Sequence, residues 1–492
     1  MLSELERTRL RLSKETSRQR KSSLGQFFTP GSTAAFMAQL FPAAGGECRL
    51  LDPGAGIGSL TAAFLARWHA GGFRFDRVSV DAIELDSTLH GSLAATIAGH
   101  ERSGLSVRIC SDDFIHSAVE TIARDLFSGS PPRYTHVILN PPYKKMASDS
   151  AHRLALRRVG IETVNLYSAF LALAVELTEH GGQIVAIVPR SFCNGPYYRP
   201  FREYLLDRVA IRHIHLFDSR SAAFRDDAVL QENVILHLER AGTQGAVTIS
   251  TSTDDSFTDL TACEHPSSDI VGDGDPERII HVPTGSTQGG LSAIPGVRYT
   301  LDELGIKVST GPVVDFRFKE HLRAMPESGS VPLLYPAHFD RVSVIWPAEG
   351  IRKPNAIMHN QTTERWLYPA GYYCVVRRFS SKEEARRIVP GVVDPAVFGD
   401  VTMLGFENHL NVFHQNRGGL PEQLARGLFV FLQTTAVDEA FRRFNGHTQV
   451  NVKDLTLLRY PSREGLERLG AWATGRTELT QEQVDDSLGM LK

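Results

Sequence analysis

The sequence contains little cysteine and no long apolar segment. Its five cysteines are scattered and form no CxxC pair, so we expect no disulfide framework, as in a protein of a reducing compartment. No apolar run approaches the length that a membrane-spanning helix needs, and the opening MLSELERTRL lacks the apolar core of a signal peptide. We therefore expect a cytoplasmic protein without a membrane partner.

An excess of charge of one sign is also lacking. The formal net charge of -3 on 492 residues is close to neutral. It neither favours nor excludes nucleic acid as a partner, because a local basic surface can exist within a balanced total. A chain of this length exceeds one hydrophobic core, so we expect two or more domains.

The first half of the chain has the alternating pattern of an α/β protein. Residues 1–23 mix Leu with Arg, Lys and Glu, which predicts a basic amphipathic helix that either caps the domain or contacts a DNA backbone. Residues 24–250 predict a Rossmann-like α/β domain with a parallel sheet and helices on both faces. The predicted strands are 48–52, 78–83, 107–110, 135–139, 184–188, 211–217 and 233–237.

The composition changes after residue 250. Residues 251–277 are rich in Asp, Ser, Thr, Gly and Pro, which predicts a linker over 251–294. Beyond about Pro295 the apolar segments are shorter, contain more aromatic residues and are interrupted by Pro and Gly. We predict a second domain of mixed α and β structure over 295–492.

A glycine-rich turn follows the first predicted strand. Residues 50–60, LLDPGAGIGSL, indicate a strand, a turn and the start of a helix, and Gly54 and Gly56 let the backbone approach a ligand closely. Similar turns occur in dinucleotide binders and in structural bends. Asp52 would repel a pyrophosphate but could hydrogen-bond a cationic amino acid. S-adenosylmethionine has an amino group, a sulfonium and no phosphate, so Asp52 favours this cofactor.

Two further acids follow the next two predicted strands. Glu84 lies at the tip of the strand 78–83, where a carboxylate can bind both hydroxyls of a ribose. Asp113 follows the third strand and could accept a hydrogen bond from an adenine amino group, while Phe114 stacks on the ring. Each residue alone could be a helix cap or part of the core. Their order along successive strands predicts a binding site for S-adenosylmethionine.

The fourth predicted strand ends in Asn140-Pro141-Pro142-Tyr143. Ligands of open α/β sheets bind at the carboxyl ends of strands, and two prolines stiffen the backbone there. The amide oxygen of Asn140 and the carbonyl oxygen of Pro141 could accept two hydrogen bonds from a conjugated NH2 group and so aim its lone pair at a methyl group. Tyr143 could stack on a base that has been taken out of a duplex.

Two basic residues follow this motif directly. Lys144 and Lys145 could hold adjacent phosphates of a nucleic acid. The alternative for a Pro-Pro turn is a loop without chemistry, which the cofactor turn upstream disfavours. The motif itself establishes only an amine or amide nitrogen as the methyl acceptor, and we expect no metal site.

The order of these motifs resembles the amino-group DNA methyltransferases of the gamma order. In that family an N-terminal cofactor motif precedes the glycine turn, and a target recognition domain follows the catalytic domain. Residues 25–30, GQFFTP, are similar to the N-terminal motif, which implies cofactor contacts for Thr29 and Pro30 beside those of Asn140. A Phe after the sixth strand packs beside the extruded base in this family, and Phe224 is the candidate here, with a core or loop Phe as the alternative.

Two segments of the second domain extend the resemblance. Residues 308–317 and 444–451 are similar to restriction-modification methyltransferases of the BsuBI/PstI type, which modify adenine N6 within CTGCAG. The resemblance implies duplex DNA as the binding partner and a restriction endonuclease that is encoded separately. It also implies a monomer as the default state. We see no signature of a metal-dependent nuclease, so we expect no fused restriction activity.

The second domain also supplies candidate DNA contacts. Asn and Gln suit adenine edges and Arg suits guanine. The candidates are Arg317, Asn445, His447, Gln449 and Asn451. The run 445–451 could equally form a tight turn stabilised by its own side chains.

Other acceptors remain open at this point. Cytosine N4, a base in RNA and a protein glutamine amide also present a conjugated nitrogen, although the long C-terminal domain favours DNA. A non-catalytic DNA-binding relative is the remaining alternative. The presence of Asn140, Tyr143 and the cofactor acids argues against it.

Overall fold

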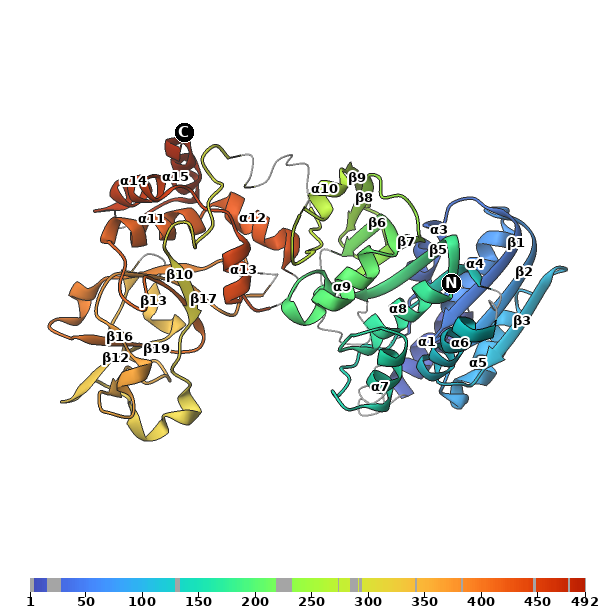
Figure 1. Cartoon of the computed structure of the whole chain (residues 1–492), viewed down its shortest axis with the longest axis horizontal. Helices are drawn as coiled ribbons and strands as arrows, with labels where there is room; N and C mark the ends of the chain where they lie inside the picture. The colour runs from blue at the N-terminus through green and yellow to red at the C-terminus, as the bar shows by residue number, and fades with distance from the viewer. Residues whose placement is uncertain are drawn as a thin grey trace. The chain divides into compact units, whose positions relative to one another are not determined.

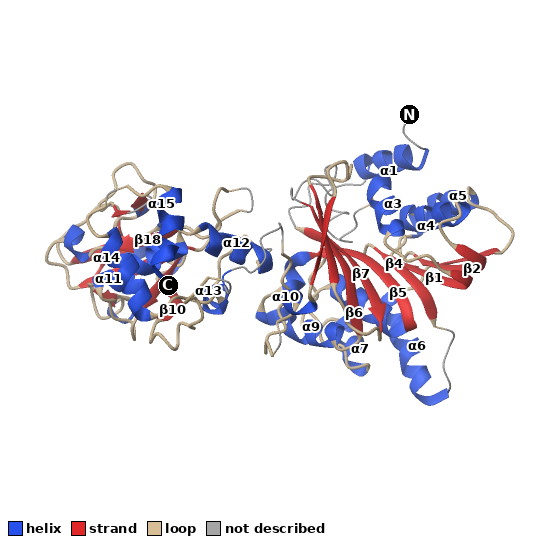
Figure 2. Ribbon diagram, turned by 90° about the horizontal axis from the view of Figure 1, so that it is seen from above, coloured by secondary structure: helices blue, strands red, loops and turns tan. Residues whose placement is uncertain are grey.

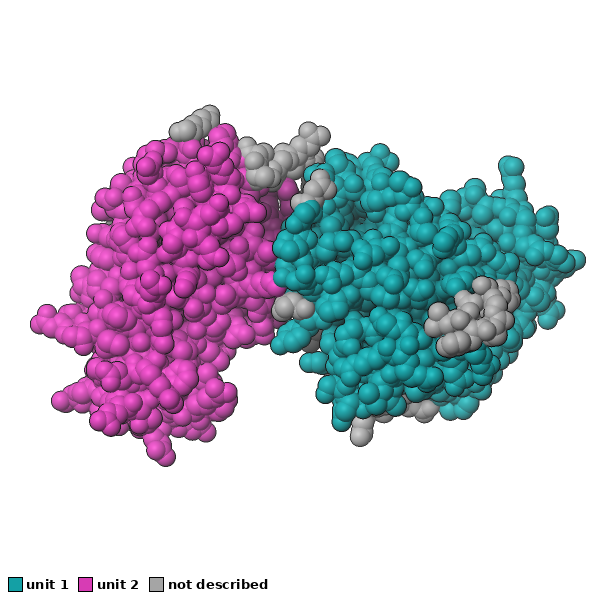
Figure 3. Space-filling model, viewed as in Figure 1, with its two compact units in different colours: residues 1–285 teal, residues 286–492 magenta. Residues whose placement is uncertain are grey.

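The computed structural model divides the chain into two compact units, Met1–Gly285 and Ser286–Lys492 (Figure 3). It describes residues 4–15, 28–128, 133–217, 232–272, 274–283, 291, 294–340, 343–381, 384–445, 448–476 and 478–491. Each unit has its own sheets and helices. No helix in these ranges is long and apolar enough to cross a membrane.

The first unit is built on a nine-stranded sheet with the strand order β3-β2-β1-β4-β5-β7-β6-β8-β9 (Figure 1). Strands β3, β2, β1, β4 and β5 run parallel, so their carboxyl ends share one edge. The strands are β1 (Gly45–Pro53), β2 (Arg74–Ile83), β3 (Leu105–Cys110), β4 (Tyr134–Leu139), β5 (Thr178–Pro189), β6 (Val209–Phe217), β7 (Asn233–Arg240), β8 (Val247–Ser252) and β9 (Thr261–His265). The seven predicted strands all lie within this sheet.

Helices cover both faces of the sheet, as Figure 2 shows. One face packs against α3 (Gly31–Gln39), α4 (Ser59–His69) and α5 (His90–Ala98). The other face packs against α6 (Phe114–Ser128), α7 (Ala151–Arg158), α8 (Leu166–Leu177), α9 (Arg199–Leu206) and α10 (Ser267–Ile270). This is the layered α/β architecture that the alternating pattern predicts.

One strand runs against the direction that the sequence predicts. β7 pairs antiparallel with both β5 and β6, so the sheet is mixed rather than parallel. Apolar runs identify strands but not their direction, because direction depends on the connections between them.

Much of the predicted linker 251–294 belongs to the first unit. β9 pairs antiparallel with β8, and Ile270, Ile280 and Val282 lie in the core of the unit. β9 ends the sheet and its side chains are largely exposed, which explains a polar composition that resembles a linker. The boundary between the units falls at Gly285 instead.

The N-terminal helix α1 (Glu4–Glu15) packs on the glycine turn. Its Leu5 and Leu12 contact a small cluster formed by Phe28, Ile57 and Leu89. For this part of residues 1–23, the packing favours the capping interpretation.

The second unit combines small sheets with helices, so a second domain of mixed structure is present. Its sheets have the orders β10-β20-β17-β18, β11-β15-β12-β19-β16 and β13-β14. The strands are β10 (Lys307–Thr310), β11 (Leu322–Arg323), β12 (Ser330–Leu334), β13 (Phe339–Asp340), β14 (Ser343–Val344), β15 (Ala356–Met358), β16 (Tyr368–Pro369), β17 (Tyr373–Arg377), β18 (Pro390–Val393), β19 (Met403–Phe406) and β20 (Leu410–His414). The helices are α11 (Glu422–Leu432), α12 (Thr435–Phe444), α13 (Val452–Leu457), α14 (Arg463–Ala473) and α15 (Gln481–Asp486).

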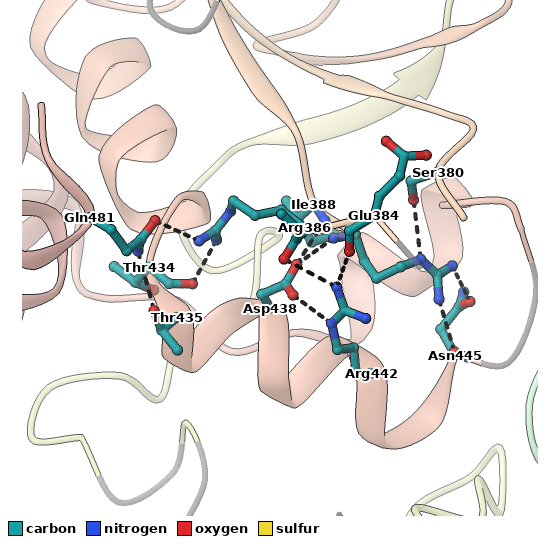
Figure 4. A network of polar contacts seen from close by, with 12 residues as sticks. Ser380, Glu384, Arg386, Ile388, Thr434, Thr435, Asp438, Arg442, Asn445 and Gln481 are labelled. Atoms are coloured by element: carbon teal, nitrogen blue, oxygen red, sulfur yellow. Dashed lines mark hydrogen bonds and ion pairs between the residues drawn. The ribbon is translucent and has the colours of Figure 1, made fainter. Parts of the chain in front are cut away.

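A polar network joins α12 and α15 to the segment between β17 and β18 (Figure 4). Asp438 of α12 accepts hydrogen bonds from the backbone amides of Arg387 and Ile388 at 2.6 and 3.0 Å. Arg386 donates to the side chain of Gln481 at 2.9 Å. These contacts satisfy polar groups that would otherwise be costly to bury and hold this side of the unit together.

Candidate active site

The glycine turn follows β1 and is hydrogen-bonded to the carboxyl end of β2. The backbone amides of Gly54 and Ala55 donate to the carbonyl of Ile83 at 2.8 and 3.0 Å. Gly54 and Gly56 have φ values of 79° and 58°, which glycine adopts without strain. The amide of Gly56 also donates to the carboxylate of Glu84 at 2.8 Å, so the turn and this acid lie side by side.

Glu84 is a buried acid at the end of β2. Its second carboxylate oxygen accepts from the amide of Asp86 at 2.7 Å. Burial raises the pKa of Glu84, while the hydrogen bonds from Asp86 and Gly56 work in the opposite direction. The two amides fix the direction in which the carboxylate points.

Asp52 lies beneath the turn and is fully buried. Thr61 Oγ1 donates to Asp52 Oδ2 at 2.6 Å, whereas Oδ1 has no hydrogen-bond partner among the described residues. Burial raises the pKa of Asp52 to about 7, against the lowering effect of the bond from Thr61. A buried acceptor without a partner is costly, and a cationic ligand group would compensate it.

Asp113 and Phe114 stand where β3 leads into α6. Asp113 Oδ2 lies 2.8 Å from His152 Nε2 of α7, and Oδ1 accepts from the amide of His116 at 3.2 Å. Burial alone would raise the pKa of Asp113, but the contacts with His152 and His116 hold it below its ordinary value. The ring of Phe114 lies 4.9 Å from that of Phe170, centroid to centroid.

These groups surround a cavity of about 240 Å³. Of the residues that the sequence predicts for the site, it is lined by Gly54, Gly56, Glu84, Asp113, Phe114 and Asn140. Asp52, Thr29 and Pro30 do not line it. Acids and aromatic rings together fit a cationic ligand that carries a flat base, and S-adenosylmethionine is such a ligand.

The sequence reasoning missed several residues of this wall, among them three with aromatic rings. Phe28, His152 and Phe170 also line the cavity. Phe28 lies beside the predicted Thr29, so the N-terminal motif could have indicated it. His152 and Phe170 come from α7 and α8, and nothing in their local sequence marks them.

Asn140 follows β4 with its amide held at both ends. Its Nδ2 donates to Thr29 Oγ1 at 3.0 Å, and its Oδ1 accepts from the hydroxyl of Tyr143 at 3.1 Å. The same hydroxyl lies 3.2 Å from the carbonyl of Ile187 in β5. Burial raises the pKa of Tyr143 well above its ordinary value, so the phenol stays protonated and can donate. Thr29 and Tyr143 thereby fix the orientation of the amide.

The chain passes from the interior to the surface of the unit after Asn140. Pro141 is buried, while Lys144 and Lys145 are exposed, and Lys144 also lines the cavity. Lys145 forms a β-bridge with Asn165, and the carbonyl of Lys144 accepts from the amide of Leu166 at 2.8 Å. The motif is therefore bound to the segment that leads into α8.

Comparison with known proteins identifies the family. Residues 108–224 match the family described as Eco57I restriction-modification methylase. The chain is 50% identical over 473 residues to the Type II methyltransferase M.BsuBI of Bacillus subtilis, with 95% of this chain and 94% of the relative covered. It is 42% identical over 474 residues to the Type II methyltransferase M.PstI of Providencia stuartii, covering 95% and 92%.

The chain belongs to the type II DNA methyltransferases of restriction-modification systems. Membership implies S-adenosylmethionine as co-substrate, in agreement with the acidic and aromatic walls of the cavity. The predictions of a methyltransferase and of its BsuBI/PstI-like type are confirmed.

Two predicted residues of the methyltransferase, Phe224 and His447, lie outside the described residues. We predicted no metal site, but one cluster of possible metal ligands is present among the described residues. Ligand atoms of Asp113, His116 and His152 lie within 4.8 Å of one another, as a metal site requires. Two of these residues also line the cofactor cavity, so the cluster belongs to the site already described.

In the second unit, Asn445 and Asn451 are held by polar side chains. Asn445, labelled in Figure 4, is buried and accepts from Arg387 at 3.0 Å. It also donates to Asp454 at 2.8 Å. Asp454 also accepts from the backbone amide of Asn451 at 2.8 Å. Such contacts are of the kind that the alternative of a turn stabilised by side chains predicts, and Asn445 lies in the interior of the unit.

The other candidate DNA contacts reach the surface. Arg317 is exposed beside Phe316, with its guanidinium 5.6 Å from the centre of that ring. Gln449 is partly exposed and forms a β-bridge with Phe379. Asn451 is partly exposed too, so these three can still meet a ligand from solvent.

Proposed function

We propose that this methyltransferase transfers a methyl group from S-adenosylmethionine to N6 of the adenine in duplex CTGCAG, after that adenine has left the base stack. The observation that carries the proposal is the amide of Asn140, oriented by Thr29 and Tyr143 at the edge of the cofactor cavity. The choice of CTGCAG is supported by the resemblance of residues 308–317 and 444–451 to the BsuBI/PstI type, together with the similarity of the whole chain to M.BsuBI and M.PstI.

The residues around the cavity suit the cofactor group by group. When bound, S-adenosylmethionine supplies a methyl group made electrophilic by its sulfonium. Glu84 would bind the ribose hydroxyls, and Asp113 the adenine amino group, with Phe114 against the ring. Asp52, with an acceptor oxygen that has no partner among the described residues, would compensate the positive charge from beneath the turn. Thr29 supports this wall by accepting the bond from Asn140, and Pro30 directly precedes α3.

Asn140 and Pro141 would prepare the acceptor nitrogen. The lone pair of an aromatic amine is delocalised into its ring, which makes the nitrogen a poor nucleophile. An amide oxygen can accept two hydrogen bonds, so Asn140 Oδ1 can receive the amine as well as the Tyr143 hydroxyl. A second bond to the Pro141 carbonyl would turn the lone pair toward the methyl group. The nitrogen becomes acidic only once it carries the methyl group, so no strong base is needed beforehand.

Each of the two units has its own role in the proposed function. The first unit would hold the cofactor and the extruded base, with Lys144 and Lys145 on neighbouring phosphates. Residues 295–492 would act as the target recognition domain. The enzyme would work as a monomer on each strand in turn, beside a separately encoded restriction endonuclease.

Methylation of defined duplexes tests the proposal. The purified protein and labelled S-adenosylmethionine are incubated with a CTGCAG duplex and with a duplex of scrambled order, and the modified nucleoside is identified by mass spectrometry. We expect N6-methyladenine in the CTGCAG duplex alone. N4-methylcytosine would overturn the choice of base, and equal labelling of both duplexes would overturn the choice of site.

A further inference from the structure

An exposed tyrosine stands beside the active site. Tyr197 has 78% of its surface accessible, the largest value for a large apolar side chain in the described residues. It follows β5, which pairs in parallel with β4. Because these strands end at the same edge, the segment after β5 lies next to the motif that begins at Asn140.

The backbone around Tyr197 is held firmly from inside. Arg202, fully buried in α9, donates to the carbonyl of Gly195 at 2.9 Å and to that of Phe192 at 3.2 Å. The next residue, Tyr198, packs against the core of the unit and lies 3.4 Å from Ser191 through their hydroxyls. An aromatic ring on a fixed turn keeps its exposed position with little loss of side-chain freedom on binding.

Hydrogen bonds connect this turn to the catalytic motif. The side chain of Asn165 donates to the hydroxyl of Tyr198, and Asn165 forms a β-bridge with Lys145. The turn that carries Tyr197 is therefore connected through Asn165 to the segment of Lys144 and Lys145, which are exposed cations suited to phosphates. An exposed aromatic ring and two exposed cations on connected segments have the chemistry of a DNA contact.

A buried polar side chain without hydrogen-bond partners among the described residues lies close to this turn in the sequence. The side chain of Asn194 is 99% buried, since 1% of its surface is accessible, and neither amide atom has a hydrogen-bond partner within the described residues. A buried carboxamide without partners is costly, so this side chain stores part of the cost of folding the turn. The residue lies three positions before Tyr197.

We infer that Tyr197 enters the base stack of the bound duplex and fills the space left by the extruded base, stacking on the neighbouring bases. This rests on the proposed function, because only an enzyme that extrudes a base leaves such a space. An unfilled gap loses the stacking energy of the bases on both sides, and an aromatic ring in the gap restores part of that energy.

Binding to two duplexes tests the inference. One carries 2-aminopurine at the target position, which fluoresces when extruded, and the other carries an abasic target position, where the gap exists already. Tyr197→Ala should bind both duplexes about tenfold more weakly, in line with the loss of one stacking contact. Tyr197→Phe should behave like the wild type, since it keeps the ring. Val107→Ala removes an exposed apolar side chain from β3 and serves as the matched control.

The abasic duplex separates the possible roles of the ring. A loss confined to the 2-aminopurine duplex would mean that Tyr197 stacks on the extruded base and would overturn the inference. Unchanged binding by Tyr197→Ala, or an equal loss in Val107→Ala, would overturn it as well. Cofactor binding by calorimetry should be the same in all variants. If the wild type failed to methylate CTGCAG, the proposed function would be wrong. The binding measurements on the variants do not test that point.

Discussion

The amide of Asn140 is oriented before any substrate arrives. Thr29 takes its N–H group and Tyr143 donates to its oxygen, so the acceptor points in a fixed direction. Preorganised acceptors of this kind act without reorganisation at the moment of reaction. In the proposed reaction, Thr29 and Tyr143 would therefore determine how well Asn140 holds the acceptor amine.

Replacing Asn140 should therefore lower turnover and spare cofactor binding. We expect Asn140→Ala to lose about a hundredfold or more of kcat, the usual cost of removing one preorganised group. Tyr143→Phe loses only the hydroxyl that orients the amide, and should lose about five- to tenfold. Single-turnover methyl transfer measures both, and calorimetry with S-adenosylmethionine is the control. Equal kcat values for Asn140→Ala and the wild type would contradict the assignment.

The raised pKa of Asp52 predicts how the stability of the folded chain changes with pH. Its pKa is about 7 when folded and near 3.8 when unfolded, because burial disfavours the charged form. The folded chain then binds this proton more tightly, so the contribution to stability is greatest below about pH 4 and falls as the pH rises toward 7. The fall is at most about 4 kcal/mol, from 1.36 kcal/mol per pKa unit.

The variant Asp52→Asn removes this titration. We expect its melting temperature to decline less steeply between pH 4 and pH 7 than that of the wild type, measured by scanning calorimetry without cofactor. Parallel curves would show that the buried acid is not the cause. S-adenosylmethionine should reduce the difference if its positive charge stabilises the ionised carboxylate.

The sequence indicates the acids of the cavity better than its remaining walls. Glu84 and Asp113 each follow a strand, and the order of strands in a parallel sheet brings such positions to one edge. Phe170 and His152 lie on helices whose rotation against the sheet depends on packing across the whole unit. We expected Asp52 on the wall of the cavity. Its carboxylate instead accepts a hydrogen bond from Thr61 and lies beneath the glycine turn.

At the scale of elements, a buried ion pair fastens β7 to β5. Arg190 follows β5 and lies 2.8 Å from Glu232, which precedes β7, with 4% and 3% of their side chains exposed. The backbone amide of Arg190 also donates to the carbonyl of Glu232 at 2.7 Å. The antiparallel strand that the sequence pattern did not predict is thereby attached at the active-site edge.

Breaking this pair should destabilise the first unit. Arg190→Met leaves a buried carboxylate without its cation, and we expect a loss of about 3–5 kcal/mol. The double change Arg190→Met with Glu232→Leu removes both charges and should recover most of it. Arg199→Ala, which breaks an exposed pair with Glu203, is the matched control and should cost less than about 1 kcal/mol. Urea unfolding measures all three, and similar losses for Arg190→Met and Arg199→Ala would refute the role of burial.

Sequence reasoning failed where elements look alike in composition. β9 resembles a linker because its side chains face solvent, and β7 resembles every other buried strand although it runs the opposite way. Both errors concern pairing between strands, which hydrophobic periodicity does not encode. The alternation of strands and helices, by contrast, was enough to predict a layered α/β unit.

At the scale of the molecule, the cofactor cavity is formed by residues of the first unit alone. We expect a fragment of residues 1–285 to bind S-adenosylmethionine with an affinity within a few-fold of the full chain. It should lose sequence-specific methylation, because the proposed recognition domain is absent. Calorimetry and methylation of CTGCAG duplexes measure the two properties. A fragment that still selects CTGCAG would place recognition in the first unit.

The role of Asp454 in holding Asn445 and Asn451 has a consequence for substitutions at this place. One carboxylate accepts hydrogen bonds from both asparagines, and Arg387 holds Asn445 again from within. Val450, next to Asn451, is buried, and its carbonyl accepts from Asn411 at 2.7 Å. A substitution of Asp454 should therefore displace Asn445 and Asn451 together, whereas a substitution of either asparagine leaves the other one held.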